Sequence, residues 1–289
     1  MTSNCVLSSD YLSLSVAEIG AEMQYLRTHS GVDLLWHGDP TFWSGRAPVL
    51  FPIVGRAVDD KIAVGDHNAD MAQHGIARRR AFTLEEQSAL HCRHVLRADH
   101  ETLTQYPFDF TLQLTHTLSD ATLTVTARIE NHSEAPMPFG FGFHPAFRWP
   151  LPGAEEQRHA IQLLSGNNPD QQPLQSDGLL EPSRIEGPFV DGRLDIQEAL
   201  FKDGALVFPN GTDALRYCAE NGPRLSFTFH NLPDLAFWKP VDAPFLCIEP
   251  WHGTASLVGD GPQISQRPNS VTLAAGDAKE FGFCVTVEI

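Results

Sequence analysis

The chain has 289 residues, of which 42% are hydrophobic, and it contains 22 Gly and 21 Pro. This composition is typical of a globular protein with many turns, and an all-β chain of this length can form one domain. The formal net charge of −16 comes from 20 Lys plus Arg against 36 Asp plus Glu. Such a surface would repel phosphate backbones and anionic lipids, so we expect neither a nucleic acid nor a membrane as a partner.

The N-terminal residues lack a basic segment followed by an apolar one, and no apolar stretch approaches the ~18 residues of a membrane-spanning helix. A cytoplasmic protein is therefore expected. The five cysteines are an odd number, widely scattered, with no C-x-x-C pair to suggest zinc or redox work. They predict reduced thiols that are mostly buried.

Alternation of apolar and polar residues recurs along the chain and predicts half-buried strands. The clearest runs are residues 12–16, 112–118, 123–129, 225–229 and 281–289. The turn at Ser119-Asp120 joins two of these runs closely enough to predict an antiparallel hairpin.

Helical periodicity is short, and its best candidate is residues 191–201. Stretches rich in Pro, Gly and Asn at 150–153 and 166–188 predict long surface connections. Because strands of the same character continue on both sides, the sequence predicts one all-β domain over residues 1–289. We expect a large β-sandwich with minor helix.

Residues 245–249, Phe-Leu-Cys-Ile-Glu, place a carboxylate at the end of an apolar run. As a strand, the run is apolar on both faces and should be covered on both sides, with Pro250 ending its hydrogen-bonding ladder. Desolvation there would raise the pKa of Glu249 toward the range of a general base. A glutamate satisfied by an arginine or by backbone donors is the alternative, and this stretch alone leaves both open.

A second stretch, residues 138–147, alternates aromatic residues with glycine and histidine. One face carries Phe139, Phe141 and Phe143, and the other carries Gly140, Gly142 and His144. We expect the phenylalanines to anchor the strand in the core and the glycines to clear space for a ligand beside the imidazole. A core histidine with satisfied ring nitrogens is the alternative that stays open.

Two further stretches end in arginines. Residues 49–56 are the most apolar run and finish with Arg56, which either contacts a ligand or extends to solvent. Residues 73–80 place His74 beside a glycine and before three arginines in an otherwise acidic chain. Such a patch can hold an anionic group or pair with nearby carboxylates.

Metal and nucleotide motifs are missing from the sequence. Thirteen histidines are present without an H-E-x-x-H or comparable spacing, and His91 and His94 would lie on opposite faces of a strand. Serine-hydrolase and phosphate-loop patterns are also absent. The sequence therefore predicts no metal and no cofactor, and it leaves an acid/base pair as the candidate chemistry.

Five segments, in order and across nearly the whole chain, resemble the aldose 1-epimerase (galactose mutarotase-like) family. They are APVLFPIVGR, QHGIAR, GFHPAF, LFKDGALVF and FLCIEPWHG. The compact bacterial branch, related to the hexose-6-phosphate 1-epimerases, is the more similar one. The resemblance implies a large antiparallel β-supersandwich with a sugar-binding cleft, and a cofactor-independent enzyme that interconverts the α and β anomers of an aldose.

The resemblance also implies roles for individual residues. Glu249 would be the general base that takes the anomeric hydroxyl proton, and His144 the general acid that protonates the ring oxygen. Arg56 and His74 would bind and polarise the sugar near the reacting atoms, while Asp203 would hold ring hydroxyls. Each positioned acid or base is typically worth about 10² to 10⁴ in rate.

An aromatic residue, Trp238 or Trp251, would line the apolar face of the sugar. Gly55-Arg56-Ala57 stands where the main galactose mutarotases carry an Asn-Arg pair, which leaves the identity of the sugar open. The expected partner is a small aldose, bound by a monomer or a weak homodimer.

Three alternatives remain at this level. The substrate is phosphorylated, with Arg78 or Arg80 on the phosphate; or the protein is a non-catalytic sugar-binding or sensor protein; or it is a lyase or hydrolase on a similar sandwich. The last would require a second carboxylate within ~5 to 10 Å of Glu249.

Overall fold

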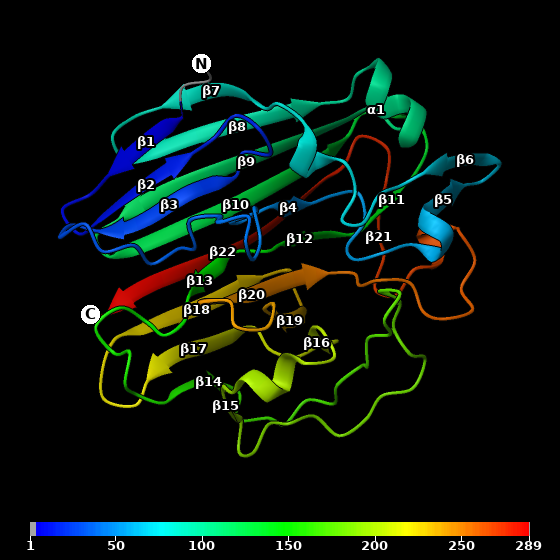
Figure 1. The fold of residues 1–289 in the computed structure, drawn as a ribbon. Helices are drawn as coiled ribbons and strands as arrows, with labels where there is room; N and C mark the ends of the chain where they lie inside the picture. Colours follow the sequence, from blue (N-terminus) through cyan, green and yellow to red (C-terminus); the bar gives the residue numbers. More distant parts are fainter. Residues whose placement is uncertain (1–3, 289) are drawn as a thin grey trace.

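The computed structural model describes residues 4–288, which form two large antiparallel sheets and three small ones (Figure 1). The larger sheet has nine strands in the order β15-β14-β17-β18-β22-β10-β9-β8-β7. Its strands are β7 (Thr83–Gln87), β8 (His91–Arg97), β9 (Phe110–Ser119), β10 (Thr122–Asn131), β14 (His159–Leu163), β15 (Arg193–Asp195), β17 (Ala214–Ala219), β18 (Arg224–His230) and β22 (Ala278–Glu288).

The second large sheet has six strands, in the order β16-β19-β20-β12-β4, with β13 paired to β20 beside β12. Its strands are β4 (Val49–Leu50), β12 (Phe141–Phe143), β13 (Ala146–Arg148), β16 (Leu206–Phe208), β19 (Asp234–Trp238) and β20 (Phe245–His252). Strand β20 is paired on both sides, so it is an interior strand of this sheet.

Small sheets and short helices complete the described chain. The N-terminal sheet is β1 (Cys5–Ser8), β2 (Leu12–Val16) and β3 (Met23–Thr28); the two pairs are β5 (Lys61–Val64) with β6 (His67–Asp70), and β11 (Met137–Phe139) with β21 (Val271–Leu273). The helices are α1 (His100–Gln105) and the 3-10 turns Val58–Asp60, Ala77–Arg79, Glu198–Phe201 and Ile264–Gln266. Within residues 4–288, none of them has the length and apolar character needed to cross a membrane.

The core lies between the two large sheets and is rich in aromatic residues. Phe141 and Phe143 of β12 pack on Phe281 and Phe283 of β22, with ring centroids 5.1 and 5.0 Å apart. Phe147 of β13 packs on Phe227 of β18 in the same way, at 5.1 Å. Aromatic pairs of this geometry add to the free energy of burial, so the six-stranded sheet is fixed against the nine-stranded one.

Most strand predictions are confirmed. Alternating runs became β2, β9, β10, β18 and β22, and the predicted hairpin joins β9 to β10 with Ser119 opposite Thr122. The last residue of the run 281–289 lies outside the described residues. The single-domain expectation stays a prediction.

The predicted helix over 191–201 is wrong. Asp191 and Gly192 have positive φ and form a turn, after which β15 pairs with β14. Leu194 and Ile196 are both buried, with an exposed residue between them. The spacing of these two side chains is that of a strand, and only the final four residues form a 3-10 turn.

Pro250 does not end its strand, contrary to the prediction. Strand β20 runs to His252, and Pro250 lies opposite Leu235 of β19. The N–H of Ile248 points to Pro145 at the junction of β12 and β13. Because N–H groups alternate in direction along a strand, the missing N–H of Pro250 falls on the same side, where β12 and β13 are interrupted and the ladder has a gap.

Candidate active site

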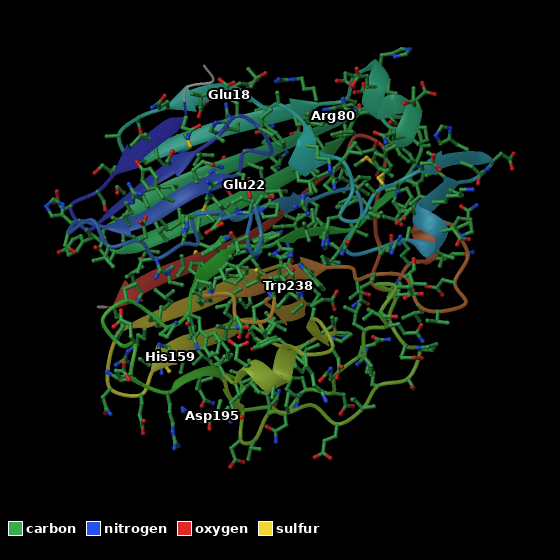
Figure 2. The ribbon with its side chains drawn as sticks, viewed as in Figure 1. Glu18, Glu22, Arg80, His159, Asp195 and Trp238 are labelled. Carbon is green, nitrogen blue, oxygen red and sulfur yellow. The ribbon has the colours of Figure 1, made fainter. Side chains whose placement is uncertain are left out.

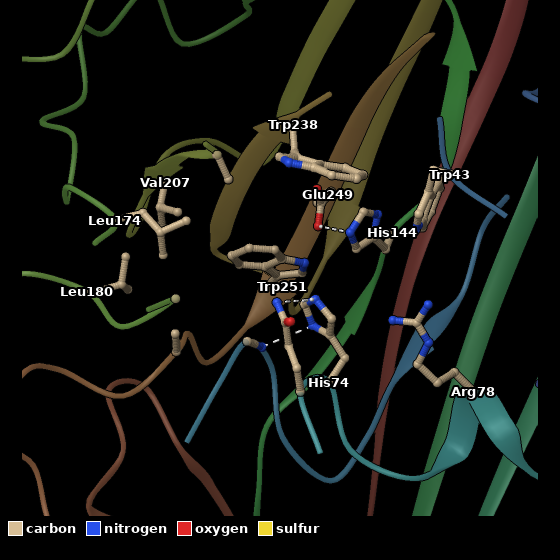
Figure 3. A pocket seen from close by; sticks show the side chains of 15 residues that line it. Trp43, His74, Arg78, His144, Leu174, Leu180, Val207, Trp238, Glu249 and Trp251 are labelled. Carbon is tan, nitrogen blue, oxygen red and sulfur yellow. Dashed lines mark hydrogen bonds and ion pairs between the residues drawn. The ribbon is translucent and has the colours of Figure 1, made fainter. Parts of the chain in front are cut away.

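A pocket of about 230 Å³ lies over the face of β19 and β20 that points away from the main core (Figure 3). It is mainly apolar, with a few convergent polar groups, which is typical of small-molecule sites. The lining residues are Trp43, Gly55, Gln73, His74, Arg78, His144, Leu174, Gly178, Leu180, Ala205, Val207, Trp238, Glu249, Trp251 and Ala255.

The alternation of β20 delivers Glu249 to this pocket. Leu246 and Ile248 belong to the main core, whereas Phe245 and Cys247 pack in a separate aromatic cluster on the opposite face. Glu249 follows Phe245 and Cys247 on that face and is 2% exposed. The doubly covered strand predicted from the sequence is therefore confirmed.

Glu249 and His144 face one another directly. Oε2 of Glu249 lies 3.2 Å from Nε2 of His144, and both side chains are buried. Desolvation raises the pKa of Glu249 well above its usual value, although the charge of Arg78 opposes this. Burial, with a smaller contribution from Arg78, lowers the pKa of His144 to about 3. Both shifts favour the uncharged form of each group, the protonated carboxyl of Glu249 and the unprotonated imidazole of His144.

Aromatic rings hold the imidazole of His144 in place. It stacks on Trp43 with centroids 5.0 Å apart and meets Trp238 edge-on at 5.7 Å (Figure 3). The indole of Trp251 fills part of the space that we expected beside His144 for a ligand. A Cβ at Gly142 would lie only 2.4 Å from Cδ1 of Trp251. Gly142 thus admits the Trp251 indole, which itself lines the pocket.

His74 presents a neutral ring to the pocket. The backbone N–H of Gly55 donates to Nδ1 at 3.1 Å, so the ring proton lies on Nε2, beside Gln73. Burial, together with nearby His144 and the arginines, lowers the pKa of His74 well below its usual value. The residue therefore supplies an uncharged N–H donor.

Arg78 is the only arginine or lysine among the described residues that line the pocket. Burial and Arg79 lower its pKa, and the carboxylates of Glu22 and Glu249 oppose this. Arg80 does not share this position, because its guanidinium pairs with Glu101 of α1. Figure 2 shows Arg80 near α1 and well away from Trp238. The structure thus removes Arg80 as a candidate for the pocket.

Two residues assigned to the sugar by resemblance lie outside the lining. Arg56 forms an ion pair with Asp60 and donates from Nη1 to the backbone carbonyl of Asp177 at 2.9 Å. Asp203 is exposed and lies near Lys202, with 3.8 Å between Nζ and Oδ2. The structure brings together Glu249, His144, His74, Arg78 and Trp238, and it leaves Arg56 and Asp203 at the surface.

One wall of the pocket comes from the connection over 166–188, which the sequence predicted to be a surface loop. Leu174 and Leu180 pack with Val207 and Ala255 in a small apolar cluster beside the pocket. The N–H of Leu180 donates to the carbonyl of Ser256 at 3.0 Å. Because Leu180 is fully buried, this part of the connection is a structural wall.

Arg267 is a buried residue that the sequence analysis missed. Its guanidinium donates to the carbonyls of Val54, Arg56 and Thr254 and to Oγ of Ser256, at 2.6–3.4 Å. Burial lowers its pKa to about 10, so it stays charged at neutral pH. Arg267 thus connects two segments, which place Gly55 and Ala255 at the floor of the pocket. No local sequence pattern predicted this role.

The donor atoms of His144, Cys247 and Glu249 lie within 4.8 Å of one another and could also hold a metal ion. Burial, helped by Glu249, raises the pKa of the Cys247 thiol well above its usual value. Two of these three donors, Glu249 and His144, already contact one another, so we interpret this set as a carboxylate–imidazole pair.

Comparisons with known proteins identify the family of the chain. The sequence model described as aldose 1-epimerase matches residues 4–282. Protein LacX (plasmid) of Lactococcus lactis subsp. lactis is 25% identical over 296 residues, which cover 97% of this chain and 98% of LacX.

Solved structures extend the likeness to the fold. A galactose mutarotase related enzyme from Lactobacillus acidophilus superposes with a TM-score of 0.94 at 25% identity, covering 99% of this chain and 98% of that one. A galactose mutarotase-like protein from Lactobacillus casei gives 0.88 at 27% identity, covering 99% and 100%. The all-β supersandwich is confirmed as the galactose mutarotase-like fold, and the chain belongs to the aldose 1-epimerase family.

Proposed function

We propose that the protein is an aldose 1-epimerase that interconverts the α and β anomers of a free hexose by acid/base catalysis. The observation that carries this proposal is the buried contact of 3.2 Å between Glu249 and His144 in an apolar pocket. Anomer exchange needs one proton removed from O1 and one delivered to O5. Both oxygens are bonded to C1, so two adjacent groups are well placed to serve them.

The proposed reaction begins with the sugar between the two groups. The Glu249 carboxylate takes the O1 proton while the His144 imidazolium gives its proton to O5, and the C1–O5 bond breaks to form the open-chain aldehyde. Rotation about C1–C2 exposes the other face of the carbonyl. Reversal of both transfers then closes the ring as the other anomer and returns the proton to His144.

This cycle consumes no proton and needs no outside acid or base. The pair holds one proton throughout, on His144 before ring opening and on Glu249 after it. Burial favours the second arrangement in the free protein, so contact with sugar hydroxyls must favour the first. Arg78 assists, because its charge lowers the pKa of Glu249. Each of the two groups is expected to contribute about 10² to 10⁴ in rate.

The decisive experiment measures anomer exchange by NMR with glucose, galactose and glucose 6-phosphate. We expect a large acceleration with a free hexose, unchanged after treatment with a chelator. Saturable sugar binding without faster exchange would instead identify a sugar-binding or sensor protein.

The pH dependence of kcat/KM should reflect the shared proton. A glutamate and a histidine with the unshifted pKa values of 4.5 and 6.5 would together carry a single proton only between pH 4.5 and pH 6.5. Because the pKa of His144 falls to about 3, the second proton binds only near that pH. We expect kcat/KM to be constant from pH 6.5 down to about 5. The alkaline limb follows the raised pKa of Glu249. A loss of activity on the acid side that is centred between pH 4.5 and 6.5 would contradict this assignment.

A phosphorylated hexose is the second candidate substrate, because Arg78 is a cation inside the pocket. The proximity of its charge to both Glu249 and His144 favours action on the reacting pair over phosphate binding. Arg78→Met is therefore expected to lower kcat by the same factor for glucose and glucose 6-phosphate. Arg80→Met, outside the pocket, is the matched control. A selective rise in KM for the phosphorylated sugar would support the sugar-phosphate alternative.

Hydrolysis is less well supported by the lining. Glycosidases use two carboxyl groups, about 5 to 10 Å apart, whereas Glu249 is the only carboxylate among the described residues that line the pocket. The buried Asp234 is engaged elsewhere, since it accepts hydrogen bonds from Gly253, Asn210 and Asn269.

A further inference from the structure

A second cluster of donor side chains lies in the nine-stranded sheet, and none of its members lines the pocket. Cys92 and His94 are two residues apart on β8 and therefore share a face. His116 of β9 lies directly opposite Cys92 in the strand register. The sulfur and one nitrogen from each histidine lie within 4.8 Å of one another.

The two histidines of this cluster lack partners. In the described part of the chain, neither ring nitrogen of His94 accepts or donates a hydrogen bond, nor does Nδ1 of His116. His94 is 0% exposed and His116 is 2% exposed, so water does not reach them freely. Buried polar groups without a partner cost free energy, and native proteins rarely leave them so. Two buried imidazoles with unpartnered nitrogens beside a thiol therefore indicate a ligand site.

Cys5 of β1 brings a second thiol next to that of Cys92, outside the three donors that lie within 4.8 Å of one another. Its side chain is buried, and burial raises the pKa of both the Cys5 and the Cys92 thiols, which also interact with each other. Strand β1 belongs to the N-terminal sheet, which lies against β8 and β9 (Figure 1). The three clustered donors and the neighbouring Cys5 thiol thus lie between two sheets.

We propose that Cys5, Cys92, His94 and His116 bind one zinc ion, which fixes the N-terminal sheet to the nine-stranded sheet. Two cysteines and two histidines form a common donor set of structural zinc sites, in which protein ligands fill all four positions. Soft sulfur and imidazole ligands together favour zinc over magnesium or calcium. Binding replaces the two thiol protons, which pass to the buffer, and forms two Zn–S and two Zn–N bonds.

This site differs from the donors near Glu249 in one respect. No member of the Cys92 cluster lines the pocket, so its zinc would stabilise the fold and take no part in the reaction. The sequence predicted no metal, because His91 and His94 lie on opposite faces of a strand. His91 does point away, toward Glu86, but the donor that shares a face with His94 is Cys92.

The test uses the intact, reduced protein, first stripped by a chelator and then titrated with cobalt(II) chloride. We expect saturation at one cobalt per chain, with thiolate-to-cobalt charge-transfer absorption and the visible bands of a tetrahedral ion. Zinc should displace the cobalt and raise the Tm of the stripped protein. No cobalt spectrum and no zinc-dependent change in Tm would overturn the proposal, and so would a Cys5–Cys92 disulfide in protein isolated without reductant.

Variants locate the ion. Cys92→Ser and His94→Leu should each abolish the cobalt spectrum, whereas Cys218→Ser, at a cysteine outside the cluster, should keep it. Glu249→Gln should also keep it, and loss of the spectrum in that variant alone would place the ion in the pocket and refute the proposal. Far-UV circular dichroism checks that each variant is folded, and cobalt titration of the unaltered chain gives a result that depends on no substitution.

Discussion

Glu249→Gln is expected to lower kcat by about 10² to 10⁴ while leaving KM for the sugar nearly unchanged. The amide has the shape of the carboxylate and can still contact His144, whose Nε2 lies 3.2 Å from Oε2 of Glu249. It cannot take the O1 proton at neutral pH. Stability should not fall, because the substitution removes an ionisable group that is costly to bury. NMR anomer exchange under saturating sugar measures the effect.

The control for this variant is Glu134→Gln, at an exposed glutamate that does not line the pocket. Its kcat should equal that of the unaltered protein. If Glu249→Gln keeps kcat within about tenfold, Glu249 is not the general base.

Arg267→Met should destabilise the protein by about 3 kcal/mol, because it removes hydrogen bonds from a charged group and leaves buried carbonyls without donors. The carbonyls belong to Val54, Arg56 and Thr254. The expected fall in Tm is roughly 6–12 °C. Since these segments form the floor of the pocket, KM should rise as well. Denaturant unfolding and sugar kinetics on the same preparation measure both effects.

Arg193→Met is the matched control for Arg267→Met. Arg193 is exposed, and its ion pair with Asp195 lies at the surface, where such pairs contribute about 0–1 kcal/mol. Equal losses of stability in the two variants would show that the hydrogen bonds of Arg267 do not fix the floor.

The sequence predicted the elements whose side chains follow a strict period of two. Alternation assigned Phe245, Cys247 and Glu249 to one face of β20, and the same rule separated His144 from the phenylalanines of its stretch. These predictions succeeded because the period of a strand is independent of what covers it. Alternation alone could not show that Glu249 lies close to His144, because their proximity depends on the pairing of β20 with β12 and β13. The family resemblance supplied the expectation that both residues act on the same sugar.

What the sequence did not predict depends on contacts between distant segments. Gly142 accommodates Trp251, a contact across 109 positions of the chain that alternation alone cannot show. Arg267 looks like any arginine before a proline, since its acceptors are backbone carbonyls that carry no sequence signal. Arg56 and Asp203 followed the motifs of the family, yet Arg56 pairs with Asp60 and Asp203 is exposed to solvent.

The pocket wall formed by Leu174 and Leu180 comes from a different part of the chain than Glu249 and His144. The Glu249–His144 pair depends on strands of the six-stranded sheet, whereas this wall belongs to a connection held by apolar packing and by backbone hydrogen bonds such as that from Leu180 to Ser256. For the proposed enzyme we therefore expect exchange of the connection to change the preferred sugar, with no alteration of Glu249 or His144. The same modularity makes residues 170–182 a natural segment to transplant between relatives when new substrate ranges are engineered.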